Sequence, residues 1–188
     1  MLASQQEIES RLAGGELCCP ACGGSLSRWG FASPRVLRTR AGTRTLRLRR
    51  AACAPCRRTH VLLSAGCVAR RRDSAEVIGA ALLASAQGVG HRQIAADLAR
   101  PPGTVRGWLR RARARSGPLR ASATRWATAL DVHPEPMRPQ QDAFEDAVEA
   151  LAVAARAWVL RFGPAEPWDV ALHLTGGLLS GGSRRGPP

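Results

Sequence analysis

Two short stretches, Cys19-Pro20-Ala21-Cys22 and Cys53-Ala54-Pro55-Cys56, form C-x-x-C pairs that are separated by 30 residues. Each C-x-x-C turn brings two thiolates to one side of the backbone, and two such turns complete a tetrahedral S4 site of the kind that holds Zn²⁺. A structural zinc would also stabilise residues 18–72, which contain few apolar side chains from which to build a core. We therefore predict a small zinc ribbon of β-hairpins with one Zn²⁺ ion and four ligands, Cys19, Cys22, Cys53 and Cys56.

Other uses of these cysteines fit the sequence less well. A disulfide framework is typical of secreted chains, and the N-terminus does not read as a secretory signal. A redox C-x-x-C would be expected within a thioredoxin-like βαβ pattern, which is not apparent. Unconnected buried cysteines would have no reason to occur as two equally spaced pairs. The roles of Cys18, Cys67 and His60 stay open, and His60 is either a substitute ligand or a neighbour of the site.

The chain is strongly basic, with a net charge of +14 over 188 residues and 28 Lys and Arg residues that are all arginine. A high-GC genome would enrich arginine in this way, but it would not remove carboxylates. Residues 18–72 nevertheless contain thirteen arginines and no Asp or Glu, whereas residues 121–188 are mildly acidic. This asymmetry is typical of a nucleic-acid-binding module joined to a separate packing or interaction module.

Short elements are predicted in the N-terminal part. Residues 1–17 have the pattern of a short amphipathic helix that buries Ile8 and Leu12. Residues 43–49 alternate as a half-buried strand does, and residues 61–63 form a second candidate strand. Arginines on the first of these strands are predicted to contact the DNA backbone, namely Arg44, Arg47 and Arg49.

Residues 73–118 have the pattern of an all-α, homeodomain-like helix-turn-helix domain. Helices are predicted at residues 75–87, 91–99 and 102–111, with Gly88 and Gly90 ending the first and Pro102 opening the third. The third helix would turn apolar residues inward and cationic ones outward, as a recognition helix does. The alternative is an ordinary three-helix core whose arginines are merely solvated.

Specific DNA contacts follow from this interpretation. Arg106 and Arg110 lie one turn apart and are predicted to reach base edges, with guanine O6 and N7 as the preferred target. Residues near helix N-termini suit phosphate contacts, and these are Arg92, Gln93 and Thr104. The remaining predicted contacts follow the backbone or complete the outward face, namely Arg111, Arg113, Gly103 and Gly107.

The C-terminal part is predicted to hold a linker at residues 119–139 that includes Trp126, a helical block at 140–180 and a disordered tail at 181–188. One apolar stripe recurs at helical spacing, formed by Phe144, Val148, Leu151, Ala155, Trp158 and Phe162. This stripe either packs within the chain, against Trp126 and Leu130, or forms a homodimer through residues 140–162.

The order of a C-P-x-C knuckle, a basic hairpin, a second C-x-x-C followed by Arg58-Thr59-His60, and a helix-turn-helix resembles the N-terminal DNA-binding region of insertion-sequence transposases. It is also similar to an uncharacterised bacterial zinc-ribbon/helix-turn-helix family. The resemblance covers about residues 18–115 and implies that the ribbon and the helix-turn-helix both contact DNA. Arg100 and Pro101 depart from the usual turn, so an irregular entry to the third helix is expected.

No enzyme is predicted. Such transposases need three separated carboxylates that hold two metal ions, whereas the acidic residues here cluster on one predicted helix, at Asp142, Glu145, Asp146 and Glu149. The sequence thus predicts a cytoplasmic, sequence-specific double-stranded-DNA-binding protein, either a transcriptional regulator or a transposase-derived factor without a catalytic domain. No membrane association or small-molecule substrate is indicated. The alternatives are a zinc-ribbon adaptor for a protein or RNA partner, and a redox protein.

Overall fold

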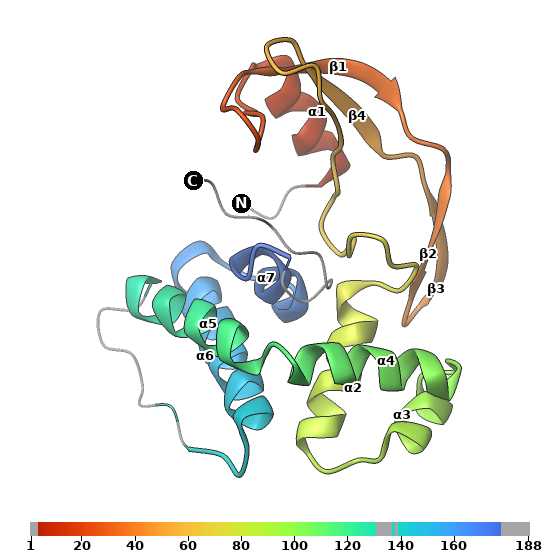
Figure 1. Cartoon of the computed structure of the whole chain (residues 1–188), viewed down its shortest axis with the longest axis vertical. Helices are drawn as coiled ribbons and strands as arrows, with labels where there is room; N and C mark the ends of the chain where they lie inside the picture. The colour runs from red at the N-terminus through yellow and green to blue at the C-terminus, as the bar shows by residue number, and fades with distance from the viewer. Residues whose placement is uncertain (1–3, 131–136, 138, 178–188) are drawn as a thin grey trace.

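The computed structural model describes residues 4–130, 137 and 139–177. Two small antiparallel sheets occupy the N-terminal part, and helices follow (Figure 1). The prediction of small β-hairpins followed by helices is confirmed at this level. Among the described residues, no helix is both long and apolar enough to cross a bilayer.

Helix α1, Gln5–Ala13, begins at a capping box in which Ser4 and Glu7 exchange hydrogen bonds. Its buried residues are Ile8 and Leu12, as the sequence predicts, but the helix is shorter than the predicted 1–17, because it ends before Gly14. Leu12 packs into a small core beside the first sheet, whose other buried members are Cys19, Leu26, Ala51 and Cys53. Two of these five side chains are cysteines of the C-x-x-C pairs, so the apolar core of this part is very limited.

The first sheet has the order β1-β4-β5, with β1 at Leu26–Phe31, β4 at Arg49–Cys53 and β5 at Thr59–Val61. The second is a hairpin of β2, Arg35–Thr39, and β3, Gly42–Leu46. The predicted strand at 43–49 is therefore wrong as a single strand, because the chain leaves one sheet after Leu46 and enters the other at Arg49. Leu48 between them is buried against Leu37 and Cys67, which explains the change of direction. The predicted strand at 61–63 overlaps β5 only at Val61.

Helices α2, Ala75–Ala86, α3, His91–Asp97, and α4, Pro102–Arg113, lie where the sequence predicts three helices. Ser74 caps α2 by accepting a hydrogen bond from the Val77 amide. The helices share one core that includes Ile78, Leu82, Ile94, Val105, Trp108 and Leu109. The apolar spacing of the sequence thus identified the inward faces correctly.

The predicted linker at 119–139 is wrong over most of its described part, because α5 is a 15-residue helix at Ser116–Leu130. Pro118 lies in the first turn of α5. The amide groups of a first turn have no acceptor within the helix, so a proline, which lacks an amide hydrogen, costs no hydrogen bond there. Ala123 and Ala127 are buried against the next helix, whereas Trp126 is exposed. The helix is therefore anchored by Leu119 and by small residues, and not by its tryptophan. Residues 131–136 and 138 of the predicted linker lie outside the described residues.

Helix α6, Ala143–Phe162, carries the predicted apolar stripe, and α7, Pro167–Leu174, packs beside it. All stripe residues are buried except Phe162, which is 59% exposed. Leu151, Ala155 and Trp158 share a core with residues of α5 and α7, so much of the stripe is covered within the single chain. Dimerisation through 140–162 stays a prediction. The predicted tail at 181–188 lies outside the described residues.

Gly79 of α2 allows α7 to pack closely, since a Cβ atom at this position would overlap the ring of Trp168. We expect Gly79→Ala to destabilise the protein by about 1–3 kcal/mol, because an overpacked core must shift its neighbours. Chemical denaturation measures this loss. Gly117→Ala on α5 is the matched control, since a Cβ there would meet nothing within 4 Å. Equal stability of both variants would contradict the close packing of α7 on α2.

Candidate metal centre and nucleic-acid interface

The four predicted ligand cysteines converge on one point. Cys19 and Cys22 lie in the turn before β1, Cys53 ends β4, and Cys56 lies in the turn that leads to β5. Their sulfur atoms all lie within 4.8 Å of one another, with 3.6 Å between Cys19 and Cys56 and 3.4 Å between Cys22 and Cys53.

These distances fit a metal site. A disulfide needs an S–S distance of about 2.05 Å, and all six cysteines are free. Four thiolates at about 2.3 Å from a tetrahedral zinc would be separated by about 3.8 Å, close to the short sulfur–sulfur distances observed here. The four cysteines could therefore hold a metal ion, and the arrangement is compatible with a structural zinc.

Glycine positions the first C-x-x-C turn against the second. A Cβ on Gly24 would lie 2.9 Å from Cγ of Pro55 and 3.2 Å from Sγ of Cys53, so only glycine fits without a shift. The amide of Cys19 donates to the carbonyl of Gly24 at 2.7 Å, which closes the turn. The two glycines after the first C-x-x-C pair, Gly23 and Gly24, predict a turn, but the close approach of Gly24 to Pro55 was not predicted.

The thiols differ in acidity. The backbone amide of Ala21, assisted by the amide of Cys22 and by contacts with Cys56 and His60, lowers the pKa of Cys19 to about 6. The amide of Cys56 also stabilises the Cys53 thiolate, but burial and the neighbouring thiols together raise the pKa of Cys53 to about 12. A bound cation would favour the thiolate form at all four positions.

The structure also places the three residues that the sequence left open. His60 lies beside the cluster, with Nε2 at 3.3 Å from Sγ of Cys19, and is thus a neighbour of the four cysteines. Cys18 is exposed and is not one of the four clustered residues. Cys67 is buried in the separate core of Leu37 and Leu48, where its sulfur lies 3.6 Å from Oγ of Ser64.

On α4, cationic and apolar residues occupy opposite faces. Val105, Trp108 and Leu109 are buried, whereas Gly103, Arg106 and Arg110 are exposed. Thr104 and Gly107 are half-buried at the edge of the exposed face. On α3, Arg92 is exposed and Gln93 donates to Asp97 at 2.8 Å. Most of the predicted groove-facing residues are thus accessible on two neighbouring helices.

Three of the arginines that are predicted to contact DNA either bind other residues of the protein or are partly buried. They are Arg49, Arg111 and Arg113. The Arg113 guanidinium donates to Oγ of Ser85 at 3.0 Å and lies 4.9 Å from the ring centre of Phe144. Arg49 is mostly buried, bonds to Glu9 at 2.5 Å and lies 3.7 Å over the Phe31 ring. Arg111 is half-buried along α4. Arg44 of β3 and Arg47, which follows β3, are both exposed to solvent.

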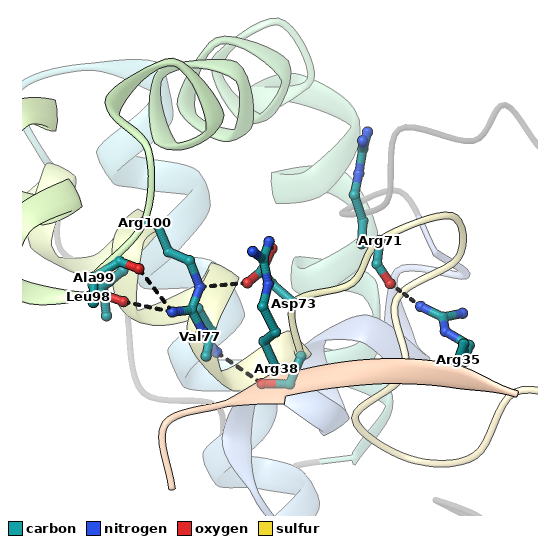
Figure 2. Close-up of polar contacts among 9 residues, drawn as sticks. Arg35, Arg38, Arg71, Asp73, Val77, Leu98, Ala99 and Arg100 are labelled. Atoms are coloured by element: carbon teal, nitrogen blue, oxygen red, sulfur yellow. Dashed lines mark hydrogen bonds and ion pairs between the residues drawn. The ribbon is translucent and has the colours of Figure 1, made fainter. Parts of the chain in front are cut away.

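One buried carboxylate joins the two parts of the molecule. Asp73 is 3% exposed and accepts a 2.6 Å hydrogen bond from Arg38 of β2 and another of 2.6 Å from Arg100 of the α3–α4 turn. Figure 2 shows both guanidinium groups at this carboxylate, with Arg100 also bonded to the carbonyls of Leu98 and Ala99. Sequence reasoning missed this site, because nothing in the spacing links residues 38, 73 and 100.

The backbone strengthens the same junction. The amide of Arg38 donates to the carbonyl of Arg72 at 2.6 Å, and the amide of Ser74 donates to the carbonyl of Arg38 at 2.9 Å. The Arg35 guanidinium donates to the carbonyl of Arg71 (Figure 2). Strand β2 therefore continues its hydrogen bonding onto the segment that opens α2.

Arg100 and Pro101 lie in the turn between α3 and α4, and the irregular entry to α4 stays a prediction. Ala99 adopts a left-handed φ of 50°, and Pro101 makes no side-chain capping bond to α4. The Arg100 guanidinium bonds to Asp73, so an ion pair connects this turn to the segment before α2.

The molecule therefore consists of small sheets with a four-cysteine cluster, a tightly joined three-helix unit and a further helical block. A family model described as "Domain of unknown function (DUF6431)" matches residues 19–108, from the first clustered cysteine to Trp108 of α4. No curated protein matches the chain. No solved structure matches it either.

Proposed function

We propose that this chain is a zinc-stabilised, sequence-specific double-stranded-DNA-binding protein. It would act as a transcriptional regulator or as a transposase-derived DNA-recognition factor without a catalytic domain. The observation that carries the proposal is α4, where exposed arginines lie opposite a buried apolar face, on a helix fixed to two others. An α-helix presented in this way fits the major groove of B-DNA.

The charge distribution supports the same partner. Thirteen arginines and no carboxylate occur in residues 18–72, and Arg44 and Arg47 of this segment are exposed. Arginines that neutralise phosphates release counterions, so they add affinity without sequence preference. The proposed division of roles is that the sheet region supplies general affinity and α4 supplies sequence choice.

Zinc is the metal that four thiolates in tetrahedral arrangement favour. The ion would be structural, since all four cysteines are ligands and leave no position for a substrate. Elemental analysis of the purified protein tests this directly, and one zinc per chain is expected. Selection of bound sequences from a random duplex library tests the second half of the proposal, and recovery of a common motif is expected. If the selection enriches no common motif, sequence-specific binding is contradicted.

Two substitutions separate the proposed roles. Arg106→Ala should cost about 1–3 kcal/mol for the selected sequence and relax the preference at one base pair. Arg47→Ala should weaken all duplexes alike and lower the salt slope by about 0.9 for each phosphate that the protein no longer neutralises. Fluorescence anisotropy at several salt concentrations measures both effects.

Arg125→Ala is the matched control, since this exposed arginine lies on α5, away from α4. It should leave affinity and salt slope almost unchanged. Identical profiles for Arg106→Ala and Arg47→Ala would contradict the division of roles, and affinity independent of salt would contradict electrostatic binding itself.

One feature favours a second candidate function, that of a zinc-ribbon adaptor for an RNA or protein partner. Trp29 and Phe31 of β1 are 61% and 42% exposed, and Arg47 lies 4.8 Å from the Phe31 ring centre. Exposed aromatic rings beside arginines suit stacking with unpaired bases. Tighter binding to single-stranded RNA than to any duplex, abolished in Trp29→Ala, would favour this function over the first.

A further inference from the structure

A pocket lies at the junction between the sheet region and α4. Its volume is about 320 Å³, at the low end of the range of about 300–1,000 Å³ that is typical of small-ligand sites. One wall comes from β2 and the segment before α2, and the other from α4. The charged residues of its lining are Arg38, Arg70, Arg71, Arg72, Arg111 and Asp73.

The charges in this pocket are unbalanced. Five of its ten lining residues are arginines, and its one carboxylate, Asp73, is already shared between Arg38 and Arg100. Burial lowers the pKa of Arg111, and the neighbouring charges of Arg71, Arg110 and Arg115 lower it further. Cations brought together at this cost would be stabilised by an anion in the space between them.

A hydrogen-bond donor is also available, because Thr104 adds a hydroxyl group to the α4 wall. The Arg38 side chain is 34% exposed and donates from Nη2 to Asp73, whereas its Nε is covered by protein atoms and does not face the pocket.

Two glycines, Gly103 and Gly107, leave the backbone of the α4 wall without side chains. A Cβ on Gly107 would lie 3.3 Å from Nη1 of Arg111, so the absence of a side chain gives this guanidinium its place along the helix. A Cβ on Gly103 would meet nothing within 4 Å, which leaves the first turn of α4 open. The positive end of the helix dipole lies at this first turn and favours an anion.

We propose that this pocket binds one phosphate group of a duplex backbone, with Arg111 and Arg70 as its principal cations. Guanidinium groups bind phosphate oxygens through paired, charge-assisted hydrogen bonds, which suits this lining. The inference rests on the proposed function and deepens it, because it assigns a phosphate contact to the junction between the two parts. A phosphate held there is contacted by both parts at once and positions α4 in the groove.

The test uses the full chain and two variants, Arg111→Gln and Arg70→Gln, with Arg125→Gln as a matched loss of one charge on α5. Each pocket variant should lower affinity for random-sequence duplex DNA by about tenfold and reduce the salt slope by about 0.9, the value for one phosphate. Arg125→Gln should leave both unchanged. Thermal unfolding of each variant shows whether the fold is intact.

A second measurement locates the phosphate. Duplexes of the selected sequence, each with one neutral methylphosphonate, are bound to the wild-type and Arg111→Gln proteins. At one position the modification should weaken the wild type strongly and should weaken Arg111→Gln less, because only Arg70 still binds that phosphate in the variant. Additive losses at every position, or wild-type salt slopes in both pocket variants, would overturn the pocket while leaving the proposed function intact.

One more titration distinguishes a phosphate of a duplex backbone from a free phosphate, and it also separates failure of the pocket from failure of the proposed function. If the wild type binds no duplex, the proposed function itself fails, and with it a backbone phosphate in the pocket. A titration with a 5′-mononucleotide, followed by the NMR signals of arginine Nε–H groups, then shows whether the pocket takes a free phosphate. Binding of the mononucleotide without duplex binding would overturn the duplex as the source.

Discussion

Cys53→Ser is expected to unfold residues 18–72 and to abolish duplex binding, and chelation of the metal should have the same result. Structural zinc contributes about 10–16 kcal/mol to the folding of small domains at neutral pH. The buried core of the first sheet is small, and two of its five members, Cys19 and Cys53, are themselves clustered cysteines. Without the metal, this core is too small to offset the conformational entropy of the segment.

The helices should keep their structure under the same treatment. Their two cores contain no cysteine, and they bury large side chains such as Leu82, Trp108, Leu151 and Trp158. Hydrogen exchange resolved by segment would measure this difference, with rapid exchange in β1 and β4 and continued protection in α2 and α6. Elemental analysis of the same samples gives the metal content.

Cys18→Ser is the matched control, because Cys18 neighbours Cys19 in the chain but is exposed and outside the cluster. It should retain the metal content and thermal stability of the wild type. If Cys53→Ser and Cys18→Ser have the same melting temperature and the same hydrogen-exchange rates, the cluster is not needed for folding. The zinc-ribbon interpretation is then wrong.

Asp73→Asn is expected to destabilise the protein by about 3 kcal/mol. Removing one partner of a buried ion pair costs about 3–5 kcal/mol, since a charge is left without compensation. The Arg100 side chain is 13% exposed and the Arg38 side chain is 34% exposed, so water partly compensates the second cation and reduces the effect. Denaturant titration gives the free energy of unfolding.

Glu76→Gln provides the comparison, since it also removes a carboxylate that bonds an arginine of the hairpin region. The Arg40–Glu76 pair is 4.0 Å long, and its side chains are 62% and 39% exposed. Exposed pairs contribute about 0–1 kcal/mol, so the loss should stay below about 1 kcal/mol. Hydrogen exchange should also increase around residues 98–101 in Asp73→Asn only. A smaller loss in Asp73→Asn than in Glu76→Gln would refute the role of Asp73 at the junction.

The parts of the fold that the sequence predicted are those governed by local pattern. The spacing of Ile78, Leu82, Val105 and Trp108 identified the inward faces of α2 and α4. The four cysteines were predicted to converge because two C-x-x-C turns have few other uses in one chain.

The features that the sequence did not predict depend on partners far along the chain. Ser116-Gly117-Pro118 has the composition of a helix end, yet α5 begins there, because Ala123 and Ala127 bury against α6. Arg49 alternates as a solvent-facing strand residue does, but Glu9 of α1 binds it. Asp73 follows three arginines in sequence, and only the folded chain brings residues 38 and 100 to it.

The position of Asp73 has a thermodynamic consequence for any ligand that spans the junction. Two segments that are 62 residues apart in sequence meet at one carboxylate, so their relative orientation is set before a ligand arrives. Binding partners that must first be ordered lose affinity to the entropy of that ordering. A preorganised junction avoids this loss, and more of the free energy of its contacts then remains as affinity.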